Sequence, residues 1–331
     1  MSSVAERSEN PLARVRDAVW RPTPASLRLL ALLSVVVNAG IIVTGGAVRL
    51  TKSGLGCSTW PKCTPDSMIP TSSPDHSPMH MAIEFGNRTL TFLVLAAGIA
   101  VLVAALRSVP RRRDLVRLAA VQPFGVLAQA AWGGLTVLTD LHPAVVAGHF
   151  MLSPLLLIAC VALYVRAGEG DGPARPLVSE RLRALSLALA GVTALLMVAG
   201  TVVTGTGPHG GDDRSKRFGF EIEQVTRVHS ALAWITVALT VALLIGLWRS
   251  GAPHSVRRPV LVLLAVELAQ GVIGYVQYFL GVPELLVALH MLGSALLWIA
   301  VLRVVLATRD RGPLPAAEPV PAPARPAPQP A

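Results

Sequence analysis

Long uninterrupted runs of apolar residues constrain this chain more than any other feature. A helix needs about 18 or more such residues to cross the hydrocarbon core of a bilayer. Runs of that length span residues 29–48, 82–106, 115–138, 143–165, 184–206, 226–248, 259–280 and 285–308. Because backbone polar groups in lipid must be satisfied within their own helix, we predict an all-α membrane protein with eight transmembrane helices.

The charged residues indicate how these helices are oriented. The formal net charge is +10, and arginine gathers in the tails and in alternate loops, those between spans 2 and 3, 4 and 5, and 6 and 7. Loops rich in Lys and Arg face the cytoplasm, so both termini are predicted to be cytoplasmic in a bacterial plasma membrane. This topology accounts for the basic excess, and we expect membrane lipid but no nucleic acid as a partner.

The chain also contains an internal repeat. Span 3 contains "LAQAAWGGLTVL" and span 7 contains "LAQGVIGYVQYF", while span 1 ends "IIVTGGAV" and span 5 ends "TVVTGTGP". The separation from Gln129 to His149 is 20 residues, as it is from Gln270 to His290. Both copies begin on the same side, so we predict two tandem four-helix bundles related by an axis along the membrane normal.

The repeat and the composition divide the chain into five segments. The two bundles are residues 28–167 and 184–308, joined by a cytoplasmic linker at 168–183. A polar N-terminal tail covers 1–27 and a Pro/Ala-rich tail covers 309–331. Because proline and alanine of this kind cannot build a packed core, the second tail is predicted to be disordered.

Ionisable residues within the spans mark the candidate site, because they are costly in lipid and are usually functional. All the even-numbered spans start on the outer side, and their first turns carry Glu84, Asn87, His149, His229 and His290. Each half therefore offers a facing pair near the outer face: Asn87 or Glu84 with His149, and His229 with His290. Two inward-facing histidines on separate helices are suited to axial ligation of heme iron.

Other interpretations of these residues remain open. A single membrane histidine can equally serve helix packing, whereas two at equivalent depth in a repeat favour a ligand pair. The pattern alone does not distinguish heme from copper or zinc, although zinc usually binds thiolates as well. Glu267 in span 7 is either a proton-path residue or, more simply, a protonated carboxyl in an interhelical hydrogen bond. His209 is either part of the site mouth or a solvated loop histidine.

Two cysteines lie in the first outer loop, in "GCSTWPKC". The outside of a bacterial membrane is oxidising, so Cys57 and Cys63 are expected to form a disulfide. A zinc site is disfavoured because only two cysteines are present there. Whether the pair is structural or redox-active stays open.

Several of these motifs together resemble one family. They are "GGAVRLTKSGLGCSTWPKC", "IEFGNRTLTF", "TGTGPHGGD" and the pattern that ends at the three membrane histidines. They resemble the heme A synthase family, and the resemblance covers roughly residues 28–308. It implies an oxidoreductase that oxidises the C8 methyl group of heme O to the formyl group of heme A, the prosthetic group of aa3-type terminal oxidases. It also implies two four-helix halves and a heme b cofactor.

The resemblance also implies roles for individual residues. His229 and His290 match the pair that binds heme b in the C-terminal half. Glu84 and His149 match residues of the N-terminal half, which would hold the substrate heme, and Cys57 and Cys63 match its paired cysteines. Asn87 and Arg88 would lie beside the substrate, with Glu84 as a proton acceptor in methyl hydroxylation.

The chain departs from the family pattern at Asn87, where members often have histidine. With His149 alone, the substrate iron would be five-coordinate, or His80, two turns further out, would supply a second ligand. An iron with one histidine keeps a free position, which suits oxidation, whereas a doubly ligated heme suits electron transfer. For Glu84, an ion pair with its i+4 neighbour Arg88 is the plainer alternative to catalysis.

Rival functions share some of these features. A di-heme membrane cytochrome that exchanges electrons with quinone would use the same histidines and the same repeat. A thiol oxidoreductase would need only the cysteines, and a transporter would leave the histidines unexplained. For a heme A synthase, the expected partners are heme O, heme O synthase, cytochrome oxidase assembly factors, and quinone or another electron acceptor. The sequence leaves the oxygen source and the oligomeric state undetermined.

Overall fold

The computed structural model describes residues 20–71 and 77–314, and long helices dominate this part of the chain. The helices of the first half are α2 (Pro24–Leu50), α3 (Pro78–Arg107), α4 (Arg113–Leu138) and α5 (Pro143–Arg166). Those of the second half are α6 (Glu180–Thr206), α7 (Ile222–Arg249), α8 (His254–Phe279) and α9 (Glu284–Ala307). The all-α prediction is confirmed, and the predicted bounds lie within a few residues of these.

The membrane prediction is confirmed for most of these helices. Within the described ranges, seven are long and apolar enough to cross a membrane, which defines a multi-pass membrane protein. The helix outside this set is α4, although it has 26 residues and packs between α3 and α5. Gln122, Pro123 and Gln129 interrupt its apolar run, which lowers its mean hydropathy.

Local sequence explains where several helices begin. Proline occupies the first turn of α2, α3 and α5, where its missing N–H costs nothing. The hydroxyl of Thr23 accepts a hydrogen bond from Ser26 N at 3.1 Å and caps α2. Ser179 does the same for α6 by accepting from Leu182 N at 3.4 Å, which satisfies one of the exposed N–H groups of each first turn.

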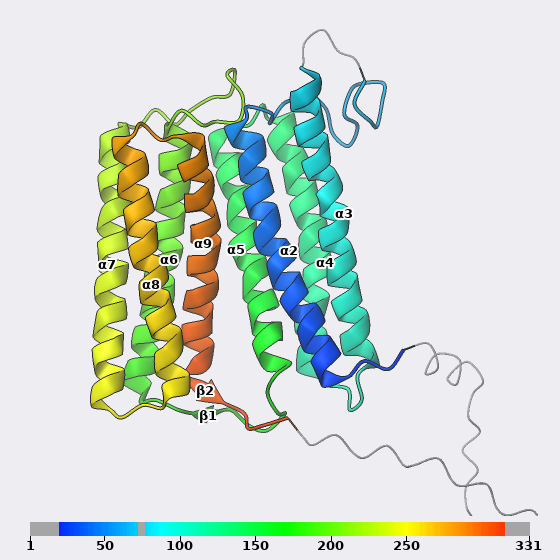
Figure 1. Cartoon of the computed structure of the whole chain (residues 1–331). Coiled ribbons are helices and arrows are strands. Elements are labelled where there is room, and N and C mark those ends of the chain that lie inside the picture. Colours follow the sequence, from blue (N-terminus) through cyan, green and yellow to red (C-terminus); the bar gives the residue numbers. More distant parts are fainter. Residues whose placement is uncertain (1–19, 72–76, 315–331) are drawn as a thin grey trace, which may run out of the picture.

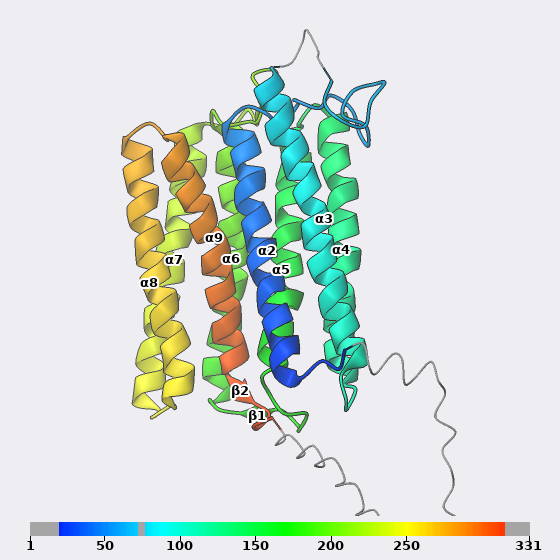
Figure 2. The same ribbon diagram turned by 45° about the vertical axis from the view of Figure 1, so that its right-hand side comes forward.

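The helices stand side by side with their axes nearly aligned, and successive helices run in opposite directions (Figures 1 and 2). In the first half α2 packs on α3 and α5, and α4 lies between α3 and α5. In the second half α6 packs on α7 and α9, and α8 lies between α7 and α9. Contacts across the middle of the molecule come from α2, α5, α6 and α9.

The middle of the molecule is held by apolar packing and by one buried hydrogen bond. The indole of Trp298 on α9 donates to the carbonyl of Pro154 on α5 at 2.9 Å. A carbonyl oxygen has two lone pairs, so that of Pro154 can accept this bond in addition to a helical one. Met291 of α9 lies against Gly46 of α2, where no side chain larger than hydrogen would fit without a shift.

A short β-ladder corrects the prediction for the linker and the C-terminal tail. Arg175–Pro176 (β1) pairs antiparallel with Arg309–Asp310 (β2), so the predicted disorder from residue 309 is wrong for these residues. The linker and the end of α9 emerge at the same end of the bundle (Figure 1), and this proximity allows backbone pairing between distant segments. The helix α2 also begins before residue 28. Predicted tail residues 1–19 and 315–331 lie outside the described residues.

Candidate functional site

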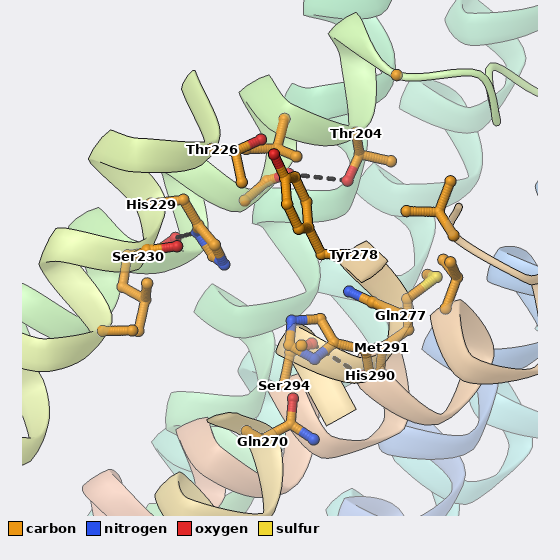
Figure 3. A pocket seen from close by; sticks show the side chains of 18 of the residues that line it. Thr204, Thr226, His229, Ser230, Gln270, Gln277, Tyr278, His290, Met291 and Ser294 are labelled. Carbon is orange, nitrogen blue, oxygen red and sulfur yellow. Dashed lines mark hydrogen bonds between the residues drawn. The ribbon is translucent and has the colours of Figure 1, made fainter. Parts of the chain in front are cut away.

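A large cavity lies mainly in the second half, lined by residues of α6, α7, α8 and α9, by the start of α5 and by Arg49 of α2. Its volume is about 1080 Å³, slightly above the range of about 300–1,000 Å³ for ligand pockets. Apolar side chains form most of its wall, and its polar lining includes Thr204, Thr226, Ser230, Gln270, Gln277, Tyr278 and Ser294 (Figure 3). A cavity of this size and chemistry suits a bulky, mainly apolar ligand with a few polar groups.

His229 of α7 and His290 of α9 both line this cavity. Their ring centres are 6.4 Å apart and their planes are inclined by 71°, and Figure 3 shows both rings projecting into the same space. With metal–nitrogen bonds of about 2 Å, two imidazoles on opposite sides of one metal ion have centres about 6.3 Å apart. The observed separation therefore fits a single iron between the two rings.

Hydrogen bonding fixes the tautomer of His229 for such a role. Nδ1 of His229 lies 3.2 Å from the carbonyl oxygen of Leu196 on α6. A carbonyl only accepts, so Nδ1 carries the proton and Nε2 keeps its lone pair. Histidine ligands of metals commonly donate their second N–H to a carbonyl in this way.

His290 differs from His229 in this respect. Its Nδ1 is buried and has no hydrogen-bond partner among the described residues. A nitrogen this inaccessible does not face the open cavity, so Nε2 is the atom through which His290 would bind a group there. The donor set fits heme, because two imidazoles from facing helices line one cavity and His229 is preset as a ligand.

Glu267 of α8 also lines the cavity. Its Oε1 accepts a hydrogen bond from the Thr240 hydroxyl of α7 at 2.7 Å, which is the interhelical bond expected from the sequence. Its Oε2 is buried and unpartnered among the described residues. The carboxyl therefore joins two helices at the cavity wall.

In the first half, His149 of α5 lies against α4. The Gln129 amide of α4 is 3.0 Å from Nδ1 of His149 when its nitrogen faces the ring, and its oxygen then accepts from the Ser153 hydroxyl at 2.7 Å. The same amide nitrogen is 3.1 Å from the backbone carbonyl of His149, which favours this orientation. Nδ1 then accepts, and a neutral His149 ring carries its proton on Nε2, so binding a metal through Nε2 requires the amide to turn. A ligand role for His149 is therefore coupled to the orientation of Gln129.

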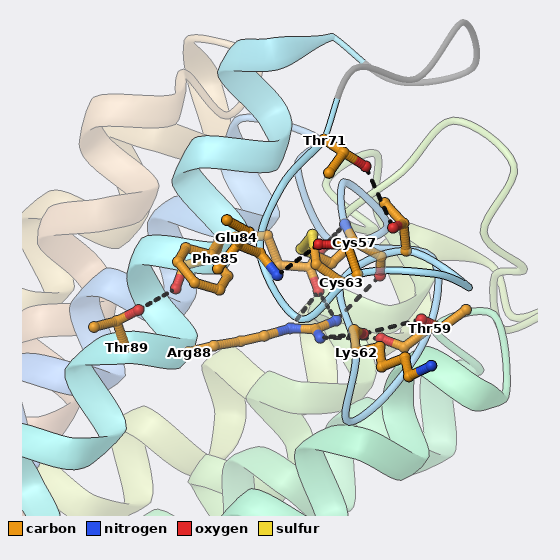
Figure 4. Close-up of a disulfide and its surroundings, with 12 residues drawn as sticks. Cys57, Thr59, Lys62, Cys63, Thr71, Glu84, Phe85, Arg88 and Thr89 are labelled. Atoms are coloured by element: carbon orange, nitrogen blue, oxygen red, sulfur yellow. Dashed lines mark hydrogen bonds and ion pairs between the residues drawn. A yellow bond between two sulfur atoms is a disulfide. The ribbon is translucent and has the colours of Figure 1, made fainter.

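Glu84 of α3 is buried, with 5% of its surface exposed, and it faces the cysteine loop (Figure 4). Its Oε2 accepts from the backbone N–H of Cys57 at 2.6 Å, and its Oε1 pairs with Arg88 at 2.6 Å. The ion pair that the sequence offered as the plainer alternative is present. It does not act alone, because the carboxylate also anchors the loop.

The cysteine loop is held by several contacts at once. Cys57 and Cys63 form a disulfide, as predicted. Arg88 donates to the carbonyls of Cys57, Thr59 and Lys62 at 3.0–3.2 Å. Trp60 at the tip packs on Gly134 of α4, directly after Gly133, which faces His149.

Asn87 and His80 occupy different positions along α3. Oδ1 of Asn87 accepts from the Thr44 hydroxyl of α2 at 2.8 Å, so Asn87 is held by the neighbouring helix. His80 belongs to the first turn of α3, two turns before Asn87 on the same helix face, and its backbone carbonyl packs against Gly56. The structure thus places Asn87 at the depth of the other site residues and His80 at the loop end.

Arg49 and His209 both bond to backbone carbonyls, and Arg49 joins the two halves. Arg49 at the end of α2 donates to the backbone carbonyls of Thr204, at 2.7 Å, and His209. His209 is further bonded through Nε2 to the carbonyl of Val282 at 2.8 Å. Both residues line the cavity, but backbone groups occupy their polar atoms.

The fold and the site together define a class of protein. Helical membrane bundles hold metal-containing cofactors by side chains that project inward from facing helices, and α7 and α9 provide such a pair. The family follows from comparison with known proteins. A family model described as cytochrome oxidase assembly protein (COX15-CtaA) matches residues 28–208, which is more than half of the chain, and the chain belongs to this family. His229 and His290 lie beyond the matched segment.

Curated relatives point in the same direction. The chain is 32% identical over 186 residues to a protein named Heme A synthase from Symbiobacterium thermophilum, covering 54% of this chain and 59% of that relative. It is 30% identical over 178 residues to a Heme A synthase of an Exiguobacterium species, covering 53% and 57%. The chain thus spans less than two thirds of the length of these relatives.

Proposed function

We propose that this chain is a heme A synthase, an oxidoreductase that converts the C8 methyl group of heme O to a formyl group and so supplies heme A to aa3-type terminal oxidases. Family membership and the names of the relatives support the proposal. The observation that carries it is the separation of 6.4 Å between the rings of His229 and His290 across a cavity of about 1080 Å³.

In this proposal heme b is the cofactor, held by His229 and His290 in the C-terminal half. When bound, heme b would supply one-electron transfer. The protein contributes the orientation of the ligands: the carbonyl of Leu196 fixes the tautomer of His229. The apolar wall excludes water and surrounds the macrocycle.

Heme O is the proposed substrate of the first half, with His149 as its protein ligand and with Asn87 and Arg88 beside it. The amide of Asn87 does not replace a histidine ligand, so one axial position stays open for chemistry. Glu84 accepts a proton as the methyl group is oxidised. Because both of its oxygens are bonded, to Arg88 and to the Cys57 N–H, we expect proton uptake to loosen one of these contacts.

We also propose the setting of the reaction. The two four-helix halves form tandem bundles in a bacterial plasma membrane, with both termini cytoplasmic and the heme sites toward the outer face. The arginine-rich loops support this orientation. Heme O synthase and cytochrome oxidase assembly factors are the expected partners. Conversion of the methyl to the formyl group takes up an oxygen atom and releases electrons, so it requires an oxygen source and an electron acceptor, and we propose a quinone as the acceptor.

The direct test is heme extraction and chromatography from a host that makes heme O but no heme A, with and without this protein. A new peak of heme A, or of its hydroxylated intermediate, is the expected result. Only heme O and heme B, in cells where the protein is present and carries heme, would contradict it. That outcome would favour the second candidate, a di-heme membrane cytochrome that exchanges electrons with quinone, which the same histidine pair also suits.

A further inference from the structure

Each membrane histidine of the site lies with its ring against a glycine of the preceding helix. A methyl group placed on Gly200 of α6 would be 3.2 Å from Cε1 of His229 on α7. The corresponding distance is 3.4 Å from Gly274 of α8 to His290 on α9. In the first half it is 3.3 Å from Gly133 of α4 to His149 on α5.

These contacts differ from ordinary close packing between membrane helices. Small residues usually bring two backbones together, as Gly98 of α3 does against backbone atoms of Gln122 and Pro123 on α4. For Gly133, Gly200 and Gly274, by contrast, imidazole atoms are the neighbours within 4 Å among the described residues outside their own helices. The missing side chain therefore makes room for a ring rather than for a backbone.

The internal repeat provides a comparison within the molecule. Gly40 in "VVVNAGIIVTGG" of α2 occupies the position of Gly200 in "LLMVAGTVVTGT" of α6. The helix that follows α2 carries Asn87 in place of a histidine, and a methyl group on Gly40 would meet nothing within 4 Å. The close contact thus occurs where a histidine is present and is missing where the histidine is replaced.

We propose that Gly200 and Gly274 are positioning residues for the cofactor, which set the depth and rotation of the His229 and His290 rings; this inference rests on the proposed heme b site. A β-carbon on Gly200 would force the His229 ring to move by a few tenths of an ångström. A β-carbon on Gly274 would reach ordinary van der Waals contact with His290, so a larger side chain, such as valine, is needed there to move the ring. Ligand geometry needs to be held within about 0.5 Å and 10–20°, so such a displacement alters the bonds from the rings to iron. Gly133 holds the His149 ring in the same way.

Helix α6 offers a matched control. A methyl group on Gly191 of α6 would meet nothing within 4 Å, and Gly191 lies outside the lining of the cavity. Gly191→Ala and Gly191→Val therefore change helix propensity without touching a histidine or the cavity. They separate the effect of ring displacement from the general effect of replacing glycine in a helix.

The experiment compares Gly200→Ala and Gly274→Val with Gly191→Ala and Gly191→Val in the full-length purified protein. The measurements are the heme content, the electron paramagnetic resonance spectrum of the low-spin heme, its midpoint potential and the thermal unfolding temperature. We expect shifted resonance positions and a shifted potential in Gly200→Ala and Gly274→Val, and wild-type values in the two Gly191 variants. Gly200→Val should lower heme content further, because the larger side chain displaces the ring more.

The outcomes distinguish this inference from the proposed function. If the wild-type protein carries low-spin heme b and Gly200→Ala and Gly274→Val match the Gly191 controls in spectrum and potential, the positioning role is wrong and the cofactor assignment stands. If the wild-type protein carries no heme b, the cofactor assignment fails, and the positioning role fails with it.

Discussion

The carboxylate of Glu84 on α3 accepts a hydrogen bond of 2.6 Å from the backbone N–H of Cys57, the first cysteine of the disulfide. A group proposed to accept a proton is thereby attached to the disulfide-bonded loop of the same half. Arg88 bonds both partners, at Glu84 Oε1 and at the Cys57 carbonyl. The position of the loop and the charge of Glu84 are therefore linked, and substitutions can separate the two.

Glu84→Gln removes the negative charge but keeps an oxygen that can accept from the Cys57 N–H. If Glu84 accepts a proton, this variant should lose about a hundredfold or more of the rate of heme A formation, the usual size of general acid–base effects. The measurement is heme A produced per enzyme in the heme O host. The heme b spectrum should be unchanged, because Glu84 lies outside the second half.

Glu84→Ala serves as the companion to this variant. It removes the acceptor as well as the charge, so the loop should also become more accessible to thiol reagents under mild reduction. Glu84→Gln with wild-type turnover would contradict proton transfer at this residue and leave the structural role alone.

Cys57→Ser removes the disulfide, which joins two cysteines six residues apart in the sequence. Chain-entropy estimates for a loop this short give about 2 kcal/mol, so the unfolding temperature should fall. Heme A formation should fall too, because Glu84 loses a fixed partner, while the spectrum of heme b should stay as in wild type. These three properties are measured by calorimetry or fluorescence unfolding, by absorption spectra and by heme chromatography. Unchanged stability and turnover would show that the disulfide is dispensable.

Asn87→His tests the open axial position of the substrate heme. A β-carbon placed on Gly45 of α2 would lie 4.0 Å from the Asn87 amide nitrogen. Because Gly45 has no side chain, a larger ring at position 87 has space beside α2. Histidine here should convert bound heme O to a doubly ligated, low-spin form and should slow oxidation, because the free position is filled. Spectra of protein loaded with heme O, together with turnover, measure this. Faster oxidation in Asn87→His would contradict the need for an open position.

The sequence predicted those features that depend on local composition. Hydropathy located the helices because lipid requires long apolar segments, and the equal depth of His229 and His290 followed from their positions in the repeat. The facing of these two rings follows from helices that run in the same direction within one half. The charge of Glu84 predicted its pairing with Arg88 through the i, i+4 spacing.

Other features depend on contacts between distant segments, which sequence reasoning did not reach. The bond from Cys57 to Glu84 requires the fold of the outer loop. The pairing of Arg175 with Asp310 requires that the linker and the end of α9 meet. Gly200 was visible in the repeat, but its neighbour His229 belongs to another helix, so its role needed the structure.

His229→Ala and His290→Ala test the cofactor site itself. Each variant removes one of the two proposed heme ligands, and a single remaining histidine would not keep the iron doubly ligated and low-spin. We expect the low-spin heme b signal to disappear from the purified protein in both variants. His254→Ala is the matched control, because His254 begins α8 at the opposite end of the bundle and should leave the signal intact. A full low-spin signal in His229→Ala and His290→Ala would show that the cofactor is held elsewhere, whereas loss in both, with His254→Ala unchanged, would locate the iron between the two rings that lie 6.4 Å apart.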